Sequence, residues 1–168
     1  MVTWSQQGKN FQELLKEFPQ FQQVGVLSKR RYIPREGRGR RPANREVELF
    51  MEFLSPEHQE LCNKPGVYIL VHEHIGDFYT GHAGTYFKNK HDGFIERVKR
   101  YINGLHQKPE DTNKHIAELA FTAPLIAWYF PYPTAPHPTT PGEVIYIGES
   151  IETYIIQKYK PIYNTRTH

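Results

Sequence analysis

Cysteine is nearly absent from this sequence, since Cys62 is the only one in 168 residues. A single cysteine excludes an internal disulfide and a zinc site built from cysteines, which is typical of proteins in a reducing compartment. The sequence also lacks the roughly 20 consecutive apolar residues of a membrane span. Residues 1–7 have neither the basic start nor the apolar run of a signal peptide. We therefore expect a cytoplasmic protein with no membrane partner.

Net charge is also small, at +3, but residues 29–45 concentrate eight basic residues against one acid, Glu36. Glycine and proline recur in this run and disfavour regular structure, so we expect a flexible basic arm. Arginine binds phosphate through two parallel hydrogen bonds and enters narrow minor grooves, which favours double-stranded DNA as partner. The candidate DNA-binding residues of the arm are Arg30, Arg31, Arg35, Arg38, Arg40 and Arg41. A solvated linker or a targeting tract is the alternative interpretation.

Residues 1–64 show helical patterns on both sides of this arm. Apolar residues at helical spacing predict one short helix over residues 8–17 and a second over residues 47–54. Ser55 followed by Pro56 is typical of a helix start and predicts a third helix that ends near Cys62. The sequence therefore predicts an N-terminal helical segment around the basic arm.

Residues 65–168 alternate between strand and helix patterns. Turn residues between two aromatic, β-branched runs predict a β-hairpin. After this hairpin, three segments with apolar residues at helical spacing predict helices, and one further apolar run predicts a third strand. Five prolines in residues 131–142 predict an extended loop. The expected strands are residues 66–71, 78–81 and 125–130, and the expected helices are residues 93–104, 115–121 and 150–160.

Four motifs follow one another in this second segment. They are Gly66-Val67-Tyr68, then Tyr79-Thr80-Gly81, then Arg97 with Tyr101, and finally Glu152 with Pro161 and Asn164. Together, over residues 65–164, they resemble the GIY-YIG nuclease family. The resemblance implies an α/β fold: a small catalytic domain over residues 65–168, with a three-stranded antiparallel sheet flanked by helices, after the helical and basic extension of residues 1–64.

The resemblance implies a role for each motif residue in hydrolysing a phosphodiester. Glu152 would hold Mg²⁺, with Mn²⁺ as a substitute, although a glutamate in a first helical turn also simply favours the helix dipole. Tyr68 would act as a general base or proton relay, which requires a neighbouring cation or hydrogen bond to lower the pKa of its phenol. Tyr79 would orient the water or phosphate. The structural alternative is that the two tyrosines only pack as a cross-strand pair.

Arg97 would reach the scissile phosphate, and Tyr101 shares its helical face four residues later. Arg100 lies on another face and is not expected to take part. His82 stands where relatives often carry lysine, so it would touch the phosphate or donate a proton. Structural roles are expected for Gly66, Gly81 and Asn164.

The sequence departs from the family pattern in places. The second motif has Thr80 where the family has isoleucine, and 17 residues separate Tyr79 from Arg97 because residues 84–92 are inserted. This insertion carries Lys88 and Lys90, which would reach a DNA groove or form a plain surface excursion. A literal Tyr-Ile-Gly at residues 146–148 is expected to be a short strand or helix lead-in, and Glu149 is the rival to Glu152.

We therefore expect a Mg²⁺-dependent DNA endonuclease from a bacterial or phage-infected cell. A sequence-specific restriction-type or mobile-element enzyme is favoured, acting as a homodimer or by two visits, since one catalytic centre cuts one strand. The alternatives are a structure-selective or nonspecific nuclease, and a DNA-binding protein with a catalytically degenerate nuclease fold.

Overall fold

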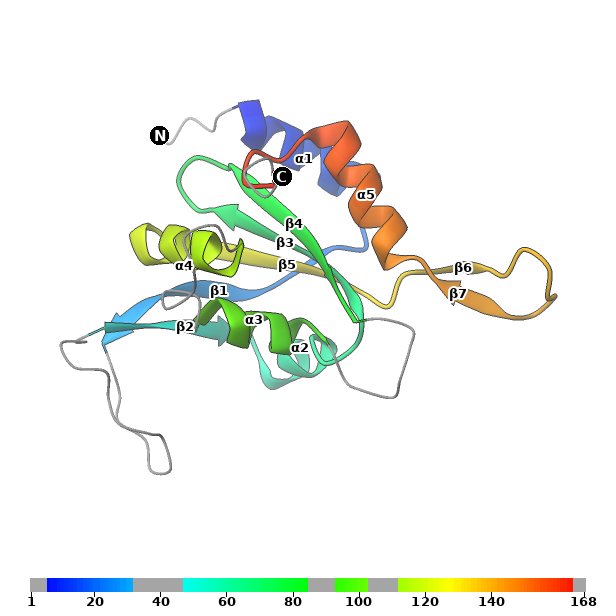
Figure 1. Cartoon of the computed structure of the whole chain (residues 1–168), viewed down its shortest axis with the longest axis horizontal. Coiled ribbons are helices and arrows are strands. Elements are labelled where there is room, and N and C mark those ends of the chain that lie inside the picture. Colours follow the sequence, from blue (N-terminus) through cyan, green and yellow to red (C-terminus); the bar gives the residue numbers. More distant parts are fainter. Residues whose placement is uncertain (1–5, 32–46, 85–92, 103–111, 165–168) are drawn as a thin grey trace.

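A five-stranded antiparallel sheet forms the centre of the protein, with strand order β2-β1-β5-β3-β4 (Figure 1). The computed structural model describes residues 6–31, 47–84, 93–102 and 112–164. Its five strands are β1 (Gln22–Arg31), β2 (Val47–Phe53), β3 (Gly66–His72), β4 (Phe78–Ala83) and β5 (Leu125–Pro131).

Helices cover both faces of this sheet (Figure 1). One hydrophobic cluster joins the sheet to α1 and α5, and a second joins its other face to α3 and α4. None of the described helices is both long and apolar enough to cross a membrane. The helices are α1 (Gln6–Glu17), α2 (Pro56–Leu61), α3 (Phe94–Ile102), α4 (Thr112–Thr122) and α5 (Gly148–Tyr159).

Strand β3 lies between these two helical layers. Because successive strand residues point to opposite faces, Tyr68 and Leu70 pack into the α3/α4 cluster, while Val67 and Ile69 pack into the α1/α5 cluster. Its first six residues are all buried. This two-sided burial explains why the strand reads as a continuous apolar run in the sequence.

The second predicted helix, over residues 47–54, is wrong, because this segment is strand β2. Leu49 and Met51 are both buried with an alternate-residue period and pair with Lys29 and Leu27 of β1. The short apolar run suits either period, and pairing with β1 decides between them. The third helix is confirmed as α2, where His58 N donates to Ser55 Oγ at 3.2 Å.

The N-terminal segment therefore contributes strands as well as helices, and the predicted sheet of three strands has five. The strand β1 pairs with both β2 and β5, which joins residues 22–31 and 47–53 to the same sheet as the later strands. The mixed α/β class is confirmed. The start of the predicted basic arm also changes, since residues 29–31 belong to β1.

The proline-rich segment after β5 is not simply a loop. It contains β6 (Thr134–Pro136), which pairs with β7 (Val144–Tyr146) in a two-stranded ribbon that projects from the body (Figure 1). The flanking bonds, His137 N to Glu143 O and Ile147 N to Pro133 O, are both 2.9 Å. Hydrogen-bonded and non-hydrogen-bonded pairs alternate along an antiparallel ribbon, and these two bonds put Pro136 at a non-hydrogen-bonded pair. The N–H that proline lacks is therefore not needed there.

Candidate active site

The six predicted catalytic residues lie on four elements that meet around β4, an edge strand of the sheet. The tyrosines and Arg97 lie on the α3 side, whereas His82 and Glu152 meet on the α5 side. The strand β3 carries Tyr68, β4 carries Tyr79 and His82, α3 carries Arg97 and Tyr101, and α5 carries Glu152.

Three tyrosines form a buried cluster on the α3 side. Tyr68 Oη and Tyr101 Oη share a hydrogen bond, and each residue is at most 3% exposed. The Tyr79 ring lies 6.2 Å from the Tyr68 ring, between centroids, and Phe94 stacks on Tyr68 at 4.6 Å. The packing fixes the Tyr68 phenol in one place, with Tyr101 as its hydrogen-bond partner.

Burial raises the pKa of the Tyr68 and Tyr101 phenols well above the ordinary value, and also raises that of Tyr79. This direction is opposite to the lowered pKa that a tyrosine general base needs. At Tyr68 the hydrogen bond shared with Tyr101 and the charge of Arg97 oppose the effect of burial on the pKa, while Glu152 adds to it. The charges of Arg97 and Glu152 act on the pKa of Tyr79 in the same two directions, with Arg97 lowering it and Glu152 raising it.

His82 and Glu152 form the other part of the site. His82 Nδ1 is hydrogen-bonded to Glu152 Oε2, and the two side chains are 23% and 20% exposed. The bond holds the carboxylate at the junction of β4 and α5 while leaving both residues accessible from solvent. His82 therefore orients Glu152 in this structure.

Gly81 lets the Tyr68 phenol lie directly against β4. A Cβ at this position would collide with Tyr68 Oη, which lies directly over the glycine. Any side chain here would push the phenol away from the edge of β4. Gly66, also predicted to be structural, pairs with Ala83 on one side and Pro131 on the other.

Asn164 anchors the chain that follows α5 to the outer edge of β4. Its Oδ1 accepts from Thr80 N at 2.9 Å, and its Nδ2 donates to Thr80 O at 2.8 Å. The side-chain amide thus satisfies the two backbone groups that a further strand would otherwise pair. This agrees with the structural role predicted for Asn164 and fixes α5 beside β4.

Tyr146 belongs to this region although the sequence interpretation gave it no role. Its hydroxyl donates to Ala83 O at 3.2 Å, one residue beyond His82. Burial raises the pKa of this phenol, and Glu152 raises it further. The signal in the sequence was a tyrosine just before the helix that carries Glu152. Residues 146–148 join a strand to a helix, since Tyr146 ends β7 and Gly148 begins α5.

The predicted DNA-binding residues are only partly described. Arg30 forms an ion pair with the buried Glu48, at 3.0 Å from Nη2 to Oε1, and its guanidinium stacks 3.5 Å from the centroid of Phe50. Arg31 is exposed. The remaining predicted contacts, Arg35, Arg38, Arg40, Arg41, Lys88 and Lys90, lie outside the described residues.

The basic arm starts far from the catalytic candidates within the sheet. Arg31 pairs with Val47, and Leu27 four residues earlier pairs with the first residue of β5. Arg31 therefore lies at the end of the sheet where β5 begins, in a strand separated from β4 by β5 and β3. Gly66 and Ala83 lie at the other end.

Glu152 has the chemistry of a magnesium ligand. Magnesium is commonly held by one or two carboxylates and several waters, so a single glutamate is a sufficient protein ligand. The described residues contain no group of three or more His, Cys, Asp or Glu side chains placed to hold a metal ion. A magnesium ion held by Glu152 would therefore keep most of its coordinating waters.

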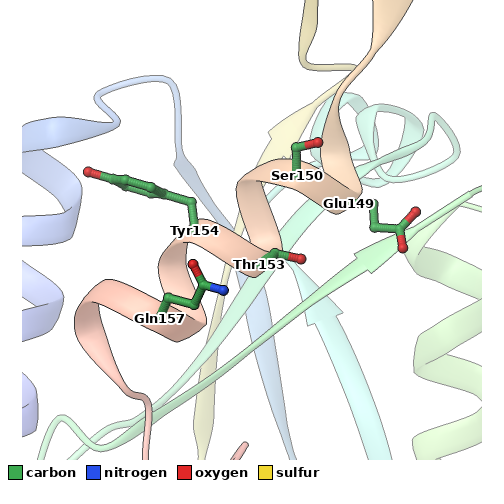
Figure 2. Close-up of a pocket in the computed structure, with 5 residues that line it drawn as sticks. All are labelled: Glu149, Ser150, Thr153, Tyr154 and Gln157. Atoms are coloured by element: carbon green, nitrogen blue, oxygen red, sulfur yellow. The ribbon is translucent and has the colours of Figure 1, made fainter.

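A separate hollow of about 380 Å³ lies on the outer side of α5 (Figure 2). Glu149 lines it and is exposed, whereas Glu152 is half-buried against His82. The six catalytic candidates do not line this hollow. Its lining consists of Glu149, Ser150, Thr153, Tyr154 and Gln157.

The comparisons with known proteins give no relative: no family model, no curated protein and no solved structure matches this chain.

Proposed function

We propose that this protein is a Mg²⁺-dependent DNA endonuclease that hydrolyses phosphodiester bonds at the edge of β4. The observation that carries the proposal is the meeting of four elements at β4, where Tyr68 of β3 bonds to Tyr101 of α3 and His82 of β4 bonds to Glu152 of α5. Strands β5, β3 and β4 would be the three-stranded sheet that the GIY-YIG resemblance implies, with β1 and β2 added along one side.

Hydrolysis requires a water oxygen to form a bond to phosphorus while the bond from phosphorus to the leaving oxygen breaks and that oxygen takes a proton. Arg97 is half-buried and pairs with no carboxylate among the described residues, so its charge is available to a phosphate oxygen. Bound Mg²⁺, held by Glu152, would supply further positive charge beside the phosphate.

Tyr68 and Tyr101 would handle the proton of the attacking water. Because burial keeps both phenols neutral, one would accept the proton of the attacking water while the other releases its own proton toward the leaving oxygen, so that neither becomes a phenolate. Tyr79 would orient the water. His82 would hold Glu152 and lie next to the bound phosphate.

Restriction-type cleavage at a defined sequence remains the favoured activity, with the basic arm supplying phosphate contacts that carry no sequence information. Each chain has one such centre, so cutting both strands would take a homodimer or two visits. Arg31 would contact DNA away from the scissile phosphate, since it lies at the opposite end of the sheet from Gly66 and Ala83.

The test is incubation of the purified full chain with plasmid and phage DNA and Mg²⁺, with EDTA and Glu152→Gln as controls. Discrete bands that need both Mg²⁺ and Glu152 would support the sequence-specific enzyme. A smear with the same requirements would favour a structure-selective or nonspecific nuclease. Intact DNA under every condition, with Mn²⁺ included, would contradict catalysis on duplex DNA and leave a DNA-binding protein as the alternative.

A further inference from the structure

Tyr132 combines two features that are unusual for an aromatic residue. It is 47% exposed, directly after the end of β5. Its φ is +45°, although it is not a glycine and precedes Pro133, which normally holds its neighbour in extended conformations. Such strain persists only where the surrounding structure enforces it, and it is found preferentially at functional sites.

Two contacts hold Tyr132 in this conformation. Its backbone N donates to Pro65 O at 2.7 Å, which ties it to the start of β3. Its ring stacks on Tyr146, with 5.9 Å between centroids and 27° between the planes. Tyr146 is in turn fixed by the bond from its hydroxyl to Ala83 O. Tyr132 is thus an exposed aromatic ring with a rigid aromatic support behind it.

This ring pair lies at the same end of the sheet as the proposed active site. Gly66 pairs with both Pro131 and Ala83, so the ends of β5 and β4 lie on either side of the start of β3. His82, the partner of Glu152, is the neighbour of Ala83. Residues 131–147, which include the ribbon β6–β7, carry a single charged residue, Glu143. This segment therefore has no lysine or arginine to bind phosphate, and the exposed ring is its distinctive binding feature.

We propose that Tyr132, supported by Tyr146, is a stacking platform for an unstacked nucleobase of DNA beside the cleaved phosphate. The inference rests on the proposed nuclease function and adds a substrate-binding site to it. Every base offers a flat π face, and stacking of a base on an aromatic side chain is tolerant of sequence. A base can reach this ring only after leaving the helical stack, so the platform favours DNA that is bulged, nicked or easily distorted.

The experiment compares Tyr132→Leu with Tyr132→Phe in the full chain. Leucine keeps an apolar side chain at the strained position but removes the π face, whereas phenylalanine keeps the ring. Binding is measured by fluorescence anisotropy in EDTA, which prevents cleavage, on a labelled duplex and on the same duplex with a bulge of unpaired adenines. Thermal unfolding of each variant checks that the fold is retained.

We expect Tyr132→Leu to bind the bulged DNA about tenfold more weakly than wild type, while Tyr132→Phe stays within about twofold. On the fully paired duplex both variants should stay within about twofold of wild type. Wild-type affinity of Tyr132→Leu for the bulged DNA would overturn the proposal, and so would an equal loss on both DNAs in a folded variant. If the wild-type chain cuts DNA and Tyr132→Leu still binds the bulged DNA normally, only the platform fails. If the wild-type chain neither binds nor cuts DNA, the proposed function fails as well.

Discussion

The two sides of the central sheet differ in how well the sequence predicted them. On the β3–β4 side, spaced motifs named residues that the fold brings together, such as Tyr68 with Tyr101 and His82 with Glu152. On the β1–β2 side, the same sequence predicted a helix over residues 47–54 where the structure has β2, and it missed β1, whose last three residues were assigned to the basic arm. Motif spacing carries three-dimensional information, whereas the apolar period of a short segment does not determine its pairing partner.

The largest effect on DNA cleavage is expected on the β3–β4 side of the sheet, the motif side, from one of the two arginines of α3. Arg97 is half-buried, and its charge lowers the pKa of the Tyr68 and Tyr79 phenols. Arg100, three residues later, is exposed. Arg97→Ala should lower the DNA cleavage rate by about 100-fold to 1000-fold, as expected for loss of a charge that stabilises the transition state. Arg100→Ala is the matched control and should keep nearly wild-type cleavage in the same gel assay. Equal rates for the two variants would remove Arg97 from the site.

Asn164 sharpens the comparison by asking whether the motif side is also held together structurally. Asn164→Ala removes both side-chain bonds to Thr80 and should lower the free energy of unfolding by roughly 2–4 kcal/mol. The exposed Asn63→Ala variant should change it by less than about 0.5 kcal/mol. Urea unfolding monitored by circular dichroism measures both. A loss for Asn164→Ala no larger than the control would contradict the anchoring role.

Neighbouring arginines on the β1–β2 side should separate stability from DNA binding. Arg30→Ala removes the charge that faces the buried Glu48 and the cation over Phe50, so we expect a loss of about 2 kcal/mol in unfolding free energy. Arg31→Ala should leave stability unchanged but reduce the salt dependence of DNA binding by about one released counterion. Unfolding and salt-titrated binding curves on both variants test this. A reversed pattern would mean that Arg30, rather than Arg31, contacts DNA.

The smallest effect concerns the link between the N-terminal helix α1 and the site-bearing helix α5. Hydrogen bonds from Tyr154, Tyr159 and Lys158 lower the pKa of Glu17 to about 2. Because the pKa is lower in the folded state, this link stabilises the protein fully above the ordinary carboxyl pKa of 4.5 and is lost as the pH falls toward 2. Melting temperatures measured across this window should fall less steeply for Glu17→Gln than for wild type. Parallel curves would show that the link contributes nothing to stability.

Much of the second half of the fold could be predicted from the sequence, and the reason is physical. The strand β3, the helices α3 and α5 and the hairpin β3–β4 each have a local signal, either a long apolar run, a helical face or turn residues. The ribbon β6–β7 was missed because its prolines suggested a loop, and only the paired register reveals that Pro136 needs no N–H there.

The site could be predicted residue by residue but not in its electrostatics. The family resemblance assigned Tyr68 and Glu152 to one site, yet the raised pKa of Tyr68 comes from its burial, which no local pattern shows. Tyr146 and Tyr132 were missed for a similar reason, because their contacts with Ala83 and with each other join segments far apart in the chain.

The central claim, an active site at the edge of β4, is tested most directly by asking which of the two glutamates of α5 is needed for DNA cleavage. Glu152→Gln and Glu149→Gln differ by three positions on one helix, but only Glu152 meets His82. Single-turnover cleavage of labelled DNA with Mg²⁺, together with binding in EDTA, separates chemistry from affinity. We predict that Glu152→Gln binds DNA and does not cut it, while Glu149→Gln cuts at nearly the wild-type rate. Cutting by Glu152→Gln at the wild-type rate would contradict an active site at the edge of β4.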